Sequence, residues 1–373
     1  MINEKKPIAG RANRAIQVMI VDDSAVVRGM VTKMLAEEPE IDVVATASNG
    51  RVALQKQAQH DLDVIVLDIE MPVMDGLTAL TKLLEVDPTV KVIMASTLTL
   101  RNADISIRAL SAGAADYVPK PTSPGDLGPT GSFRRELVEK IISLGGARRA
   151  LVPKTDAKQD STTASIRTSH PISLRKPGII RPRILAIGSS TGGPQAMFTF
   201  FSKLAGAVDL PILITQHMPP TFTKILAEHL TKWSGSPCAE ANEGEVIQHK
   251  RLYLAPGDFH MTVVSEGSHQ VIRLNQNPKE NFCRPAVDPM LRSIVQAYGA
   301  SVITVILTGM GNDGLAGGKA VVDAGGTVVA QDEKSSVVWG MPGAVAMAGI
   351  CSAVLPLGDL AGCVANIVNG GKR

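Results

Sequence analysis

The sequence contains few aromatic residues: Phe, Trp and Tyr together make up only 3% of its 373 positions. Any buried core must therefore be built from aliphatic side chains, as in α/β domains whose buried strands are runs of Val, Ile and Leu. Cysteine is also scarce, and the four that are present, Cys238, Cys283, Cys351 and Cys363, form no C-x-x-C pair. Their wide spacing argues against a zinc site or a disulfide framework and fits a reducing cytosol.

Strong charge and long apolar segments are missing as well. The formal net charge is only +3, too small by itself to indicate nucleic-acid binding, and no helix-turn-helix with a basic recognition helix is recognisable. No apolar run approaches the roughly 20 residues that a membrane helix needs, and residues 1–14 lack the apolar centre of a secretory signal. We therefore expect a cytoplasmic protein that binds no nucleic acid and does not insert directly into a membrane.

Length and periodicity predict two α/β domains joined by a linker. Residues 16–120 contain five strand–helix repeats, which predict a doubly wound parallel sheet of the flavodoxin-like kind. We expect this first domain to span residues 16–134, with a last helix ending near residue 144. Residues 182–373 predict a second, Rossmann-like parallel sheet, interrupted by an antiparallel hairpin at 260–275. Residues 145–181 are rich in Ser, Thr, Pro, Lys and Arg without periodicity, so we interpret them as a flexible linker; a docking patch for an acidic partner is the alternative.

Acidic and hydroxyl side chains follow the predicted strands of the first domain, at the edge of the sheet where the strands end. In chain order they are Asp22 and Asp23, then Asp68, then Ser96 and Thr97, and finally Lys120. Three converging carboxylates repel one another, and a hard divalent ion such as Mg²⁺ relieves that cost through oxygen ligation. Asp68 can then attack a phosphoryl donor, while Lys120 neutralises charge on the transferred group. For each residue taken alone, a helix cap or a solvated loop residue is the alternative.

The ordered set VDDS, LDIEMPVMDG, a hydroxyl and a lysine before proline resembles the response regulator receiver family over nearly all of residues 16–120. The resemblance implies that a sensor histidine kinase phosphorylates Asp68, and that Pro72 and Gly76 have structural roles. The other residues that it implicates are Asp22 and Asp23, with Asp68, as Mg²⁺ ligands, Ser96 as the switch hydroxyl, Tyr117 as the aromatic side chain that reorients, and Lys120 at the phosphoryl group.

The second domain begins with RILAIGSSTGGPQAM, in which a strand enters a glycine-rich turn and Pro194 occupies a favoured position at a helix start. One serine of this turn, His217 and Asp313 each lie beyond the carboxyl end of a different predicted strand. Folding would bring them together, as a nucleophile, a base and an orienting acid require. The backbone N–H groups that would face an oxyanion are those of Thr191 and Gly192, or those of the loop around Met310.

Each part of this second site also has a simpler interpretation. The turn could bind a nucleotide, although GSSTGG is not G-x-G-x-x-G, the second strand ends in a histidine instead of an acid, and the lysine of a P-loop is missing. A single histidine at a strand end is more often a surface or packing residue. An aspartate in GNDG is more often a turn former. Spacing alone therefore leaves the triad open.

The segments IGSSTGGP, ITQHMPP, YLAPGDFHM, RPAVD, ILTGMGNDG and WGMPGA, in this order, resemble the chemotaxis protein-glutamate methylesterase family. The resemblance implies a catalytic triad of Ser190, His217 and Asp313. It implies hydrolysis of glutamate γ-methyl esters on methyl-accepting chemotaxis receptors, and deamidation of specific receptor glutamines to glutamate, which gives adaptation in bacterial chemotaxis. No metal or other cofactor is expected in this domain.

One departure from the family pattern concerns the nucleophile. Ser189 stands where the family usually has Ala, so the chain offers two adjacent hydroxyls, and we assign the nucleophile to Ser190. His260 and Arg284 also lie in matching segments. They either line the cleft or have turn and packing roles.

The two resemblances together suggest a switch in a protein that we expect to be a monomer. The unphosphorylated receiver would pack against the hydrolase and obstruct its cleft, and phosphorylation would loosen that interface. Two other functions stay open. One is a phospho-regulated binding module whose glycine-rich turn holds a nucleotide or phosphate without catalysis, and the other is a transcription factor, for which a reading helix is missing.

Overall fold

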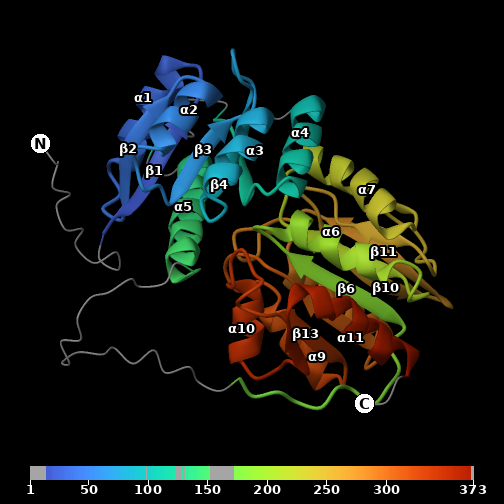
Figure 1. Cartoon of the computed structure of the whole chain (residues 1–373). Helices are drawn as coiled ribbons and strands as arrows, with labels where there is room; N and C mark the ends of the chain where they lie inside the picture. The colour runs from blue at the N-terminus through green and yellow to red at the C-terminus, as the bar shows by residue number, and fades with distance from the viewer. Residues whose placement is uncertain (1–13, 98, 122–127, 129–130, 152–171, 371–373) are drawn as a thin grey trace, which may run out of the picture. The chain divides into compact units, whose positions relative to one another are not determined.

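The chain forms two compact units, each an α/β domain (Figure 1). A computed structural model describes residues 14–97, 99–121, 128, 131–151 and 172–370. The first unit is built on a five-stranded sheet, and the second on a seven-stranded sheet with a separate two-stranded one. The predicted fold class, two parallel-sheet α/β domains, is confirmed.

The sheet of the first unit is wholly parallel, with the strand order β2-β1-β3-β4-β5. Its strands are β1 (Ile16–Val21), β2 (Ile41–Ala47), β3 (Val64–Asp68), β4 (Lys91–Ser96) and β5 (Asp116–Pro119). The helices along this part of the chain are α1 (Ala25–Leu35), α2 (Gly50–Gln57), α3 (Gly76–Val86), α4 (Leu100–Ser111) and α5 (Ser132–Leu151). β1 and β3 are buried along their whole length, which explains their continuous apolar sequences. In this flavodoxin-like order, ligands bind beyond the carboxyl ends of β1 and β3.

The helix that follows β3, α3, begins very close to the end of that strand. Asp75 caps α3, because its carboxylate accepts the N–H of Thr78 at 2.8 Å. A Cβ on Gly76, the first residue of the helix, would lie 2.1 Å from the carbonyl oxygen of Asp68. The helix can approach the strand end only because residue 76 is glycine, in agreement with the predicted structural role of this residue.

The last helix of the first unit is longer than predicted. α5 continues to Leu151, beyond the expected end near residue 144. In its last turn the buried Arg148 forms ion pairs with Asp63 at 3.0 Å and with Asp87 at 2.8 Å. The end of the helix is thus held to the domain by ion pairs and not by apolar packing. Apolar periodicity in the sequence could not reveal such contacts, and the predicted helix was therefore too short.

The predicted linker at 145–181 is correspondingly shorter than expected. Its central part, 152–171, lies outside the described residues. Residues 172–181 contain no helix or strand, but they lie against the second unit. There the N–H of Gly178 donates to Thr327 Oγ1 at 2.9 Å.

The main sheet of the second unit is also parallel, with the order β14-β13-β12-β6-β7-β9-β8. Its strands are β6 (Ile184–Ser189), β7 (Ile212–Gln216), β8 (Cys238–Glu240), β9 (Leu252–Leu254), β12 (Val302–Ile306), β13 (Thr327–Gln331) and β14 (Ala353–Leu355). The helices are α6 (Gly193–Leu204), α7 (Pro220–Ser234), α8 (Val287–Tyr298), α9 (Leu315–Asp323), α10 (Met341–Met347) and α11 (Leu357–Asn369). β8 and β14 were not predicted, because three residues at a sheet edge are too few to show a period.

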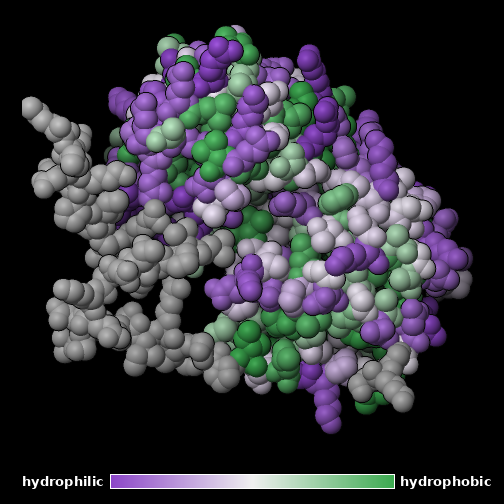
Figure 2. Space-filling model, viewed as in Figure 1, coloured by the Kyte–Doolittle hydropathy of each residue, from purple (hydrophilic) through white to green (hydrophobic). Residues whose placement is uncertain are grey.

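The predicted hairpin at 260–275 is present as β10 (His260–Glu266) paired antiparallel with β11 (His269–Asn275). α8 packs against it, and the buried residues between them and the main sheet are almost all aliphatic, as the low aromatic content requires. On the face viewed in Figure 2, hydrophilic residues are spread between smaller hydrophobic areas. Within the described ranges, every helix is too short or too polar to cross a bilayer.

Candidate functional site

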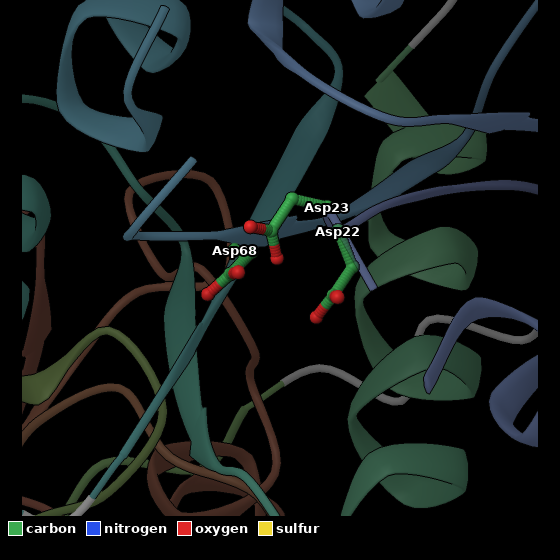
Figure 3. Close-up of side chains that lie close together, drawn as sticks. All are labelled: Asp22, Asp23 and Asp68. Atoms are coloured by element: carbon green, nitrogen blue, oxygen red, sulfur yellow. The ribbon is translucent and has the colours of Figure 1, made fainter. Parts of the chain in front are cut away.

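Three carboxylates meet at the carboxyl edge of the first sheet. Asp22 and Asp23 directly follow β1, and Asp68 is the last residue of β3, so neighbouring strands carry them to one place (Figure 3). Each offers an oxygen atom, and these oxygens lie within 4.8 Å of one another. Asp22 and Asp68 are buried, whereas Asp23 is exposed. The structure therefore brings together the acids that the sequence pattern selected.

Lys120 partly neutralises this acidic cluster. Its Nζ lies 2.8 Å from Asp22 Oδ2 and 2.8 Å from Asp68 Oδ2. Burial lowers the pKa of Lys120, but its hydrogen bonds to the two carboxylates outweigh that effect and raise the pKa. Burial raises the pKa of Asp68, and the contact with Lys120 offsets only part of the rise. A cluster of oxygen donors that one lysine does not fully neutralise fits a hard divalent cation.

The remaining predicted residues lie on β4 and β5 or directly after β4. Ser96 ends β4 and is buried, and its carbonyl oxygen accepts the N–H of Lys120 at 2.7 Å. Thr97 follows it and is exposed. Tyr117 is buried, with Lys140 Nζ 5.0 Å from the centre of its ring. Reorientation of this ring stays a prediction.

The second site starts from the pairing of two strands. β6 and β7 run in parallel with Ser189 opposite Gln216, so Ser190 and His217 leave the sheet next to each other. The N–H of His217 donates to the carbonyl of Ser189 at 3.1 Å. Gln216 Nε2 donates to the carbonyls of Ser190, at 2.9 Å, and of His217, at 3.2 Å. The backbones of the predicted nucleophile and base are thus held together.

The two adjacent serines have different environments. Ser189 is fully buried, and its hydroxyl donates to Gln216 Oε1 at 2.7 Å. Ser190 is half-buried, and its N–H donates to the carbonyl of Thr308 at 3.1 Å. A Cβ on Gly193 would lie 2.0 Å from Gln216 Oε1 and 2.9 Å from Ser189 Oγ. Ser189 therefore has a structural partner in the interior, which leaves Ser190 as the accessible hydroxyl.

An imidazole–carboxylate pair lies at the same edge. His217 Nε2 is 2.7 Å from Asp313 Oδ2, and the Asp313 side chain is almost completely buried. Burial raises the pKa of Asp313. The contact with His217 and the backbone N–H groups of Val287 and Asp288 lower the pKa by more than burial raises it, so the charged carboxylate is favoured over the protonated acid. The predicted pairing of base and acid is what the structure contains.

The other ring nitrogen of His217 has a neighbour that the sequence pattern did not indicate. Nδ1 lies 3.3 Å from Cys283 Sγ. Burial lowers the pKa of His217, but Cys283 and Asp313 together raise it above its ordinary value. Within the described part of the chain, the ring contacts Asp313 and Cys283, and a hydrogen bond to the Ser190 hydroxyl stays a prediction.

The turn that follows Ser190 has the geometry expected of a helix start. Gly192 adopts a positive φ of 75° and caps α6, with Pro194 in the first turn as predicted. Thr191 is buried, and its carbonyl accepts the Thr308 hydroxyl at 2.9 Å. Gly309 passes so near that a Cβ on it would lie 2.9 Å from Ser190 Cβ, which brings the loop containing Met310 beside the serine. The oxyanion role of Thr191, Gly192 and Met310 remains a prediction.

His260 and Arg284 make contacts that hold loops. His260 is buried; its Nε2 lies 3.1 Å from the carbonyl of Pro278, and its Nδ1 accepts the N–H of Ala286 at 3.2 Å. Arg284 forms an ion pair with Asp258 at 2.7 Å. These contacts favour the packing and turn roles over direct contact with a substrate.

Comparisons with known proteins cover both units. The CheB methylesterase family matches residues 185–364, and the response regulator receiver domain family matches residues 18–129. The chain is 58% identical over 363 residues to protein-glutamate methylesterase/protein-glutamine glutaminase 1 of Paramagnetospirillum magneticum, which covers 94% of this chain and 95% of that protein. It is 55% identical over 366 residues to the protein-glutamate methylesterase/protein-glutamine glutaminase of Azospirillum brasilense, covering 95% and 93%. The crystal structure of the Thermotoga maritima CheB methylesterase catalytic domain is 39% identical and covers 51% of this chain and 100% of that one, with a TM-score of 0.49.

Identity above one half extends over nearly the full length of these relatives and of this chain. The two matching families follow each other in the order that the sequence motifs indicated. The chain therefore belongs to the protein-glutamate methylesterase/protein-glutamine glutaminase family, with a response regulator receiver domain preceding the methylesterase domain.

Proposed function

We propose that this chain is a phosphorylation-activated serine hydrolase that demethylates glutamate γ-methyl esters on methyl-accepting chemotaxis receptors and deamidates specific receptor glutamines. The observation that carries the proposal is the 2.7 Å contact between His217 Nε2 and Asp313 Oδ2, at the sheet edge where Ser190 begins the glycine-rich turn. The names of the relatives support both reactions. The proposed phosphodonor is a sensor histidine kinase, and we expect the protein to act in the cytoplasm.

The proposed reaction begins with Ser190 Oγ attacking the side-chain carbonyl carbon of a methylated glutamate. The serine proton passes to His217 Nδ1, the ring nitrogen that Asp313 does not engage. As the tetrahedral adduct collapses, the bond from carbon to the methoxy oxygen breaks, and the imidazolium gives its proton to that oxygen, which leaves as methanol. Water then attacks the acyl-serine in the same way, which frees the glutamate and restores Ser190. With glutamine the leaving group is ammonia, so one triad serves both reactions.

Charge on the carbonyl oxygen has to be stabilised during both attacks. We propose that backbone N–H groups of Thr191 and Gly192, with the loop at Met310, face that oxygen. The start of α6 directly after Ser190 supports this assignment, because a helix N-terminus carries positive partial charge.

The rise of kcat/KM with pH on the acid side of its profile should follow the deprotonation of His217. Only the neutral imidazole can accept the serine proton, so turnover rises with pH as His217 deprotonates. Burial lowers the pKa of His217, and Cys283 and Asp313 outweigh that effect, so the midpoint should lie above the ordinary imidazole value of about 6.5. Cys283→Ala removes one of the two raising contributions. We expect the midpoint of kcat/KM to fall by about one pH unit, with activity retained.

Cys363→Ala is the matched control, because this half-buried cysteine lies on α11, away from His217. Its pH profile should coincide with that of the wild type. A midpoint that does not move in Cys283→Ala would contradict the contribution of the thiol.

In the receiver domain, we propose that Asp22, Asp23 and Asp68 hold Mg²⁺ and that Asp68 accepts the phosphoryl group. The ion, when bound, would neutralise charge on the phosphoryl oxygens during transfer. Asp68 supplies the attacking carboxylate oxygen, and Lys120, 2.8 Å from that carboxylate, is placed to bind the transferred group. Ser96 and Tyr117 are proposed as the residues that respond to it.

Removing the acceptor should uncouple the hydrolase from phosphorylation. With a small-molecule phosphodonor and Mg²⁺, methanol release by the wild type should rise by about tenfold or more, a typical allosteric effect. Asp68→Asn lacks a carboxylate to phosphorylate, so its rate should stay at the unstimulated level. Glu85→Gln, an exposed change on α3, is the control and should respond like the wild type. Full stimulation of Asp68→Asn would exclude Asp68 as the acceptor.

A further inference from the structure

A second buried carboxylate lies beside the proposed catalytic acid. Asp288, in the first turn of α8, is only 4% exposed. Its Oδ1 accepts the N–H of Gly314 at 3.0 Å and that of Gly317 at 2.6 Å. Gly314 is the N-cap residue of α9 and Gly317 lies in its first turn, so Asp288 caps a helix other than its own.

Asp313 makes the reciprocal connection. It precedes Gly314, the N-cap residue of α9, and its carboxylate accepts the N–H groups of Val287 at 2.6 Å and of Asp288 at 3.0 Å. These are the first amides of α8. Asp313 therefore caps α8, the helix that carries Asp288, and Asp288 caps α9, the helix that follows Asp313. Because helix N-termini carry positive partial charge, this reciprocal arrangement explains how two carboxylates lie together in the interior.

Asn281 links the two carboxylates directly. Its Nδ2 donates to Asp288 Oδ2 at 3.1 Å and to Asp313 Oδ1 at 3.0 Å. The residue has a φ of 51°, in the left-handed region that asparagine and glycine tolerate best. With Asp313 Oδ1 engaged in this way, the other oxygen, Oδ2, points to His217 Nε2.

We propose that Asp288 and Asn281 are positioning residues of the hydrolase reaction, which hold Asp313 in the orientation that engages His217. The inference rests on the proposed function. Neither residue contacts the reacting atoms, because both act through Asp313. Removing either should loosen the carboxylate while Ser190 and His217 themselves are unchanged, so the loss should fall on kcat and not on KM.

Asp288→Asn tests the carboxylate. The amide nitrogen introduced there would face the amide nitrogen of Asn281, and both are donors. Asn281 could then no longer donate to residue 288 and to Asp313 at the same time. Loss of one hydrogen bond to a charged group corresponds to a fall in kcat of about 10- to 100-fold. Asp313 raises the pKa of His217 through their contact, and a loosened Asp313 carboxylate would raise it less. The pKa of His217 should fall, and the acid limb of kcat/KM should move to lower pH.

The groups that influence this titration come from several elements. Those that act on His217 are Asp313 and Cys283. Asp288 itself is influenced by Asp313 and Arg292, and Arg292 forms an ion pair with Glu280. Asp313, Cys283, Arg292 and Glu280 all remain in Asp288→Asn, so a shift of the acid limb reports the loosened contact between Asp313 and His217. A defect that only lowered the fraction of folded enzyme would scale the whole profile without moving it.

Asn281→Gly removes the linking amide without straining the backbone, because glycine accepts the positive φ. It should lower kcat by about tenfold or more with KM unchanged, and it decides the question if Asp288→Asn does not fold. Asp323→Asn, an exposed carboxylate on α9, is the control and should behave like the wild type. The assay is methanol release from methylated receptor by the full chain, with the unfolding midpoint of each variant measured in parallel.

The outcomes separate the inference from the proposed function. Wild-type kcat and wild-type pH profiles in folded Asp288→Asn and Asn281→Gly would overturn the positioning role. Absence of turnover in the wild type would overturn the proposed function instead. In that case the His217 titration, followed by NMR in the wild type and in Asp288→Asn, still decides whether Asp288 acts on the imidazole. Equal titration midpoints would overturn the inference.

Discussion

Ser190→Ala is expected to lower the rate of methanol release by about 10⁴-fold or more, because removal of a nucleophile abolishes triad chemistry and leaves only the contribution of binding and oxyanion stabilisation. The serine is half-buried and directly follows β6. Gln216 Nε2 donates to its backbone carbonyl and to that of His217. Alanine preserves the backbone contacts. The unfolding midpoint should therefore stay close to that of the wild type while turnover is lost.

Ser189→Ala is the matched control, since it removes the neighbouring hydroxyl. Its cost should appear in stability, because the fully buried Oγ donates to Gln216 Oε1 at 2.7 Å. Loss of that bond should destabilise the fold by about 1 kcal/mol, with turnover within about tenfold of the wild type. The opposite result, with Ser190→Ala active and Ser189→Ala inactive, would move the nucleophile to Ser189.

The same pair of variants separates catalysis from simple binding. A phospho-regulated binding module would have no turnover in the wild type, and neither substitution would change that. Turnover in the wild type and its loss in Ser190→Ala alone would exclude the binding module.

Asp313→Asn should produce the second large effect, a loss of about 10⁴-fold in kcat. The carboxylate accepts from His217 Nε2 through Oδ2, whereas an amide nitrogen in that place would donate to the ring. The imidazole would then carry its proton on Nδ1, the nitrogen that must accept the serine proton. The base would be present in the wrong tautomer.

Stability should change in the same variant, because Asp313 also caps α8. Its oxygens accept the N–H groups of Val287 and Asp288, and an amide can replace only part of that capacity. We expect a loss of about 1 kcal/mol, typical of a helix cap, measured by urea denaturation. Asp323→Asn on α9 serves as the control for both measurements. A turnover in Asp313→Asn close to that of the wild type would exclude the triad role.

Much of the architecture followed from local sequence patterns. Runs such as VIVLD and ILITQ predict buried parallel strands, and they are β3 and β7 in the structure. In a parallel sheet the residues after each strand reach the same edge, so the pattern also located Asp68 near Asp22 and His217 near the glycine-rich turn. These inferences need only strand periodicity and the direction of the chain.

Local patterns did not decide which serine is accessible, or which side chains surround the imidazole. The family resemblance pointed to Ser190, but only the structure shows that Ser189 is fully buried and bonded to Gln216 while Ser190 is half-buried. Cys283 has no motif that marks it, yet its Sγ lies 3.3 Å from His217 Nδ1. The predicted end of α5 was likewise too early, because ion pairs with distant acids extend that helix.

The chain's sequence by itself determined the order of the elements, the two parallel sheets and the strand ends at which polar side chains gather, because these depend on periodicity within a few residues. The tertiary structure alone decided how the carboxylate of Asp313 is held, since every donor except the N–H of Gly314 comes from a distant segment: from α8, from Asn281 and from His217 directly after β7. Hydrogen bonds between segments that are distant in the chain have no local signal. Their geometry exists only after the helices and strands have packed.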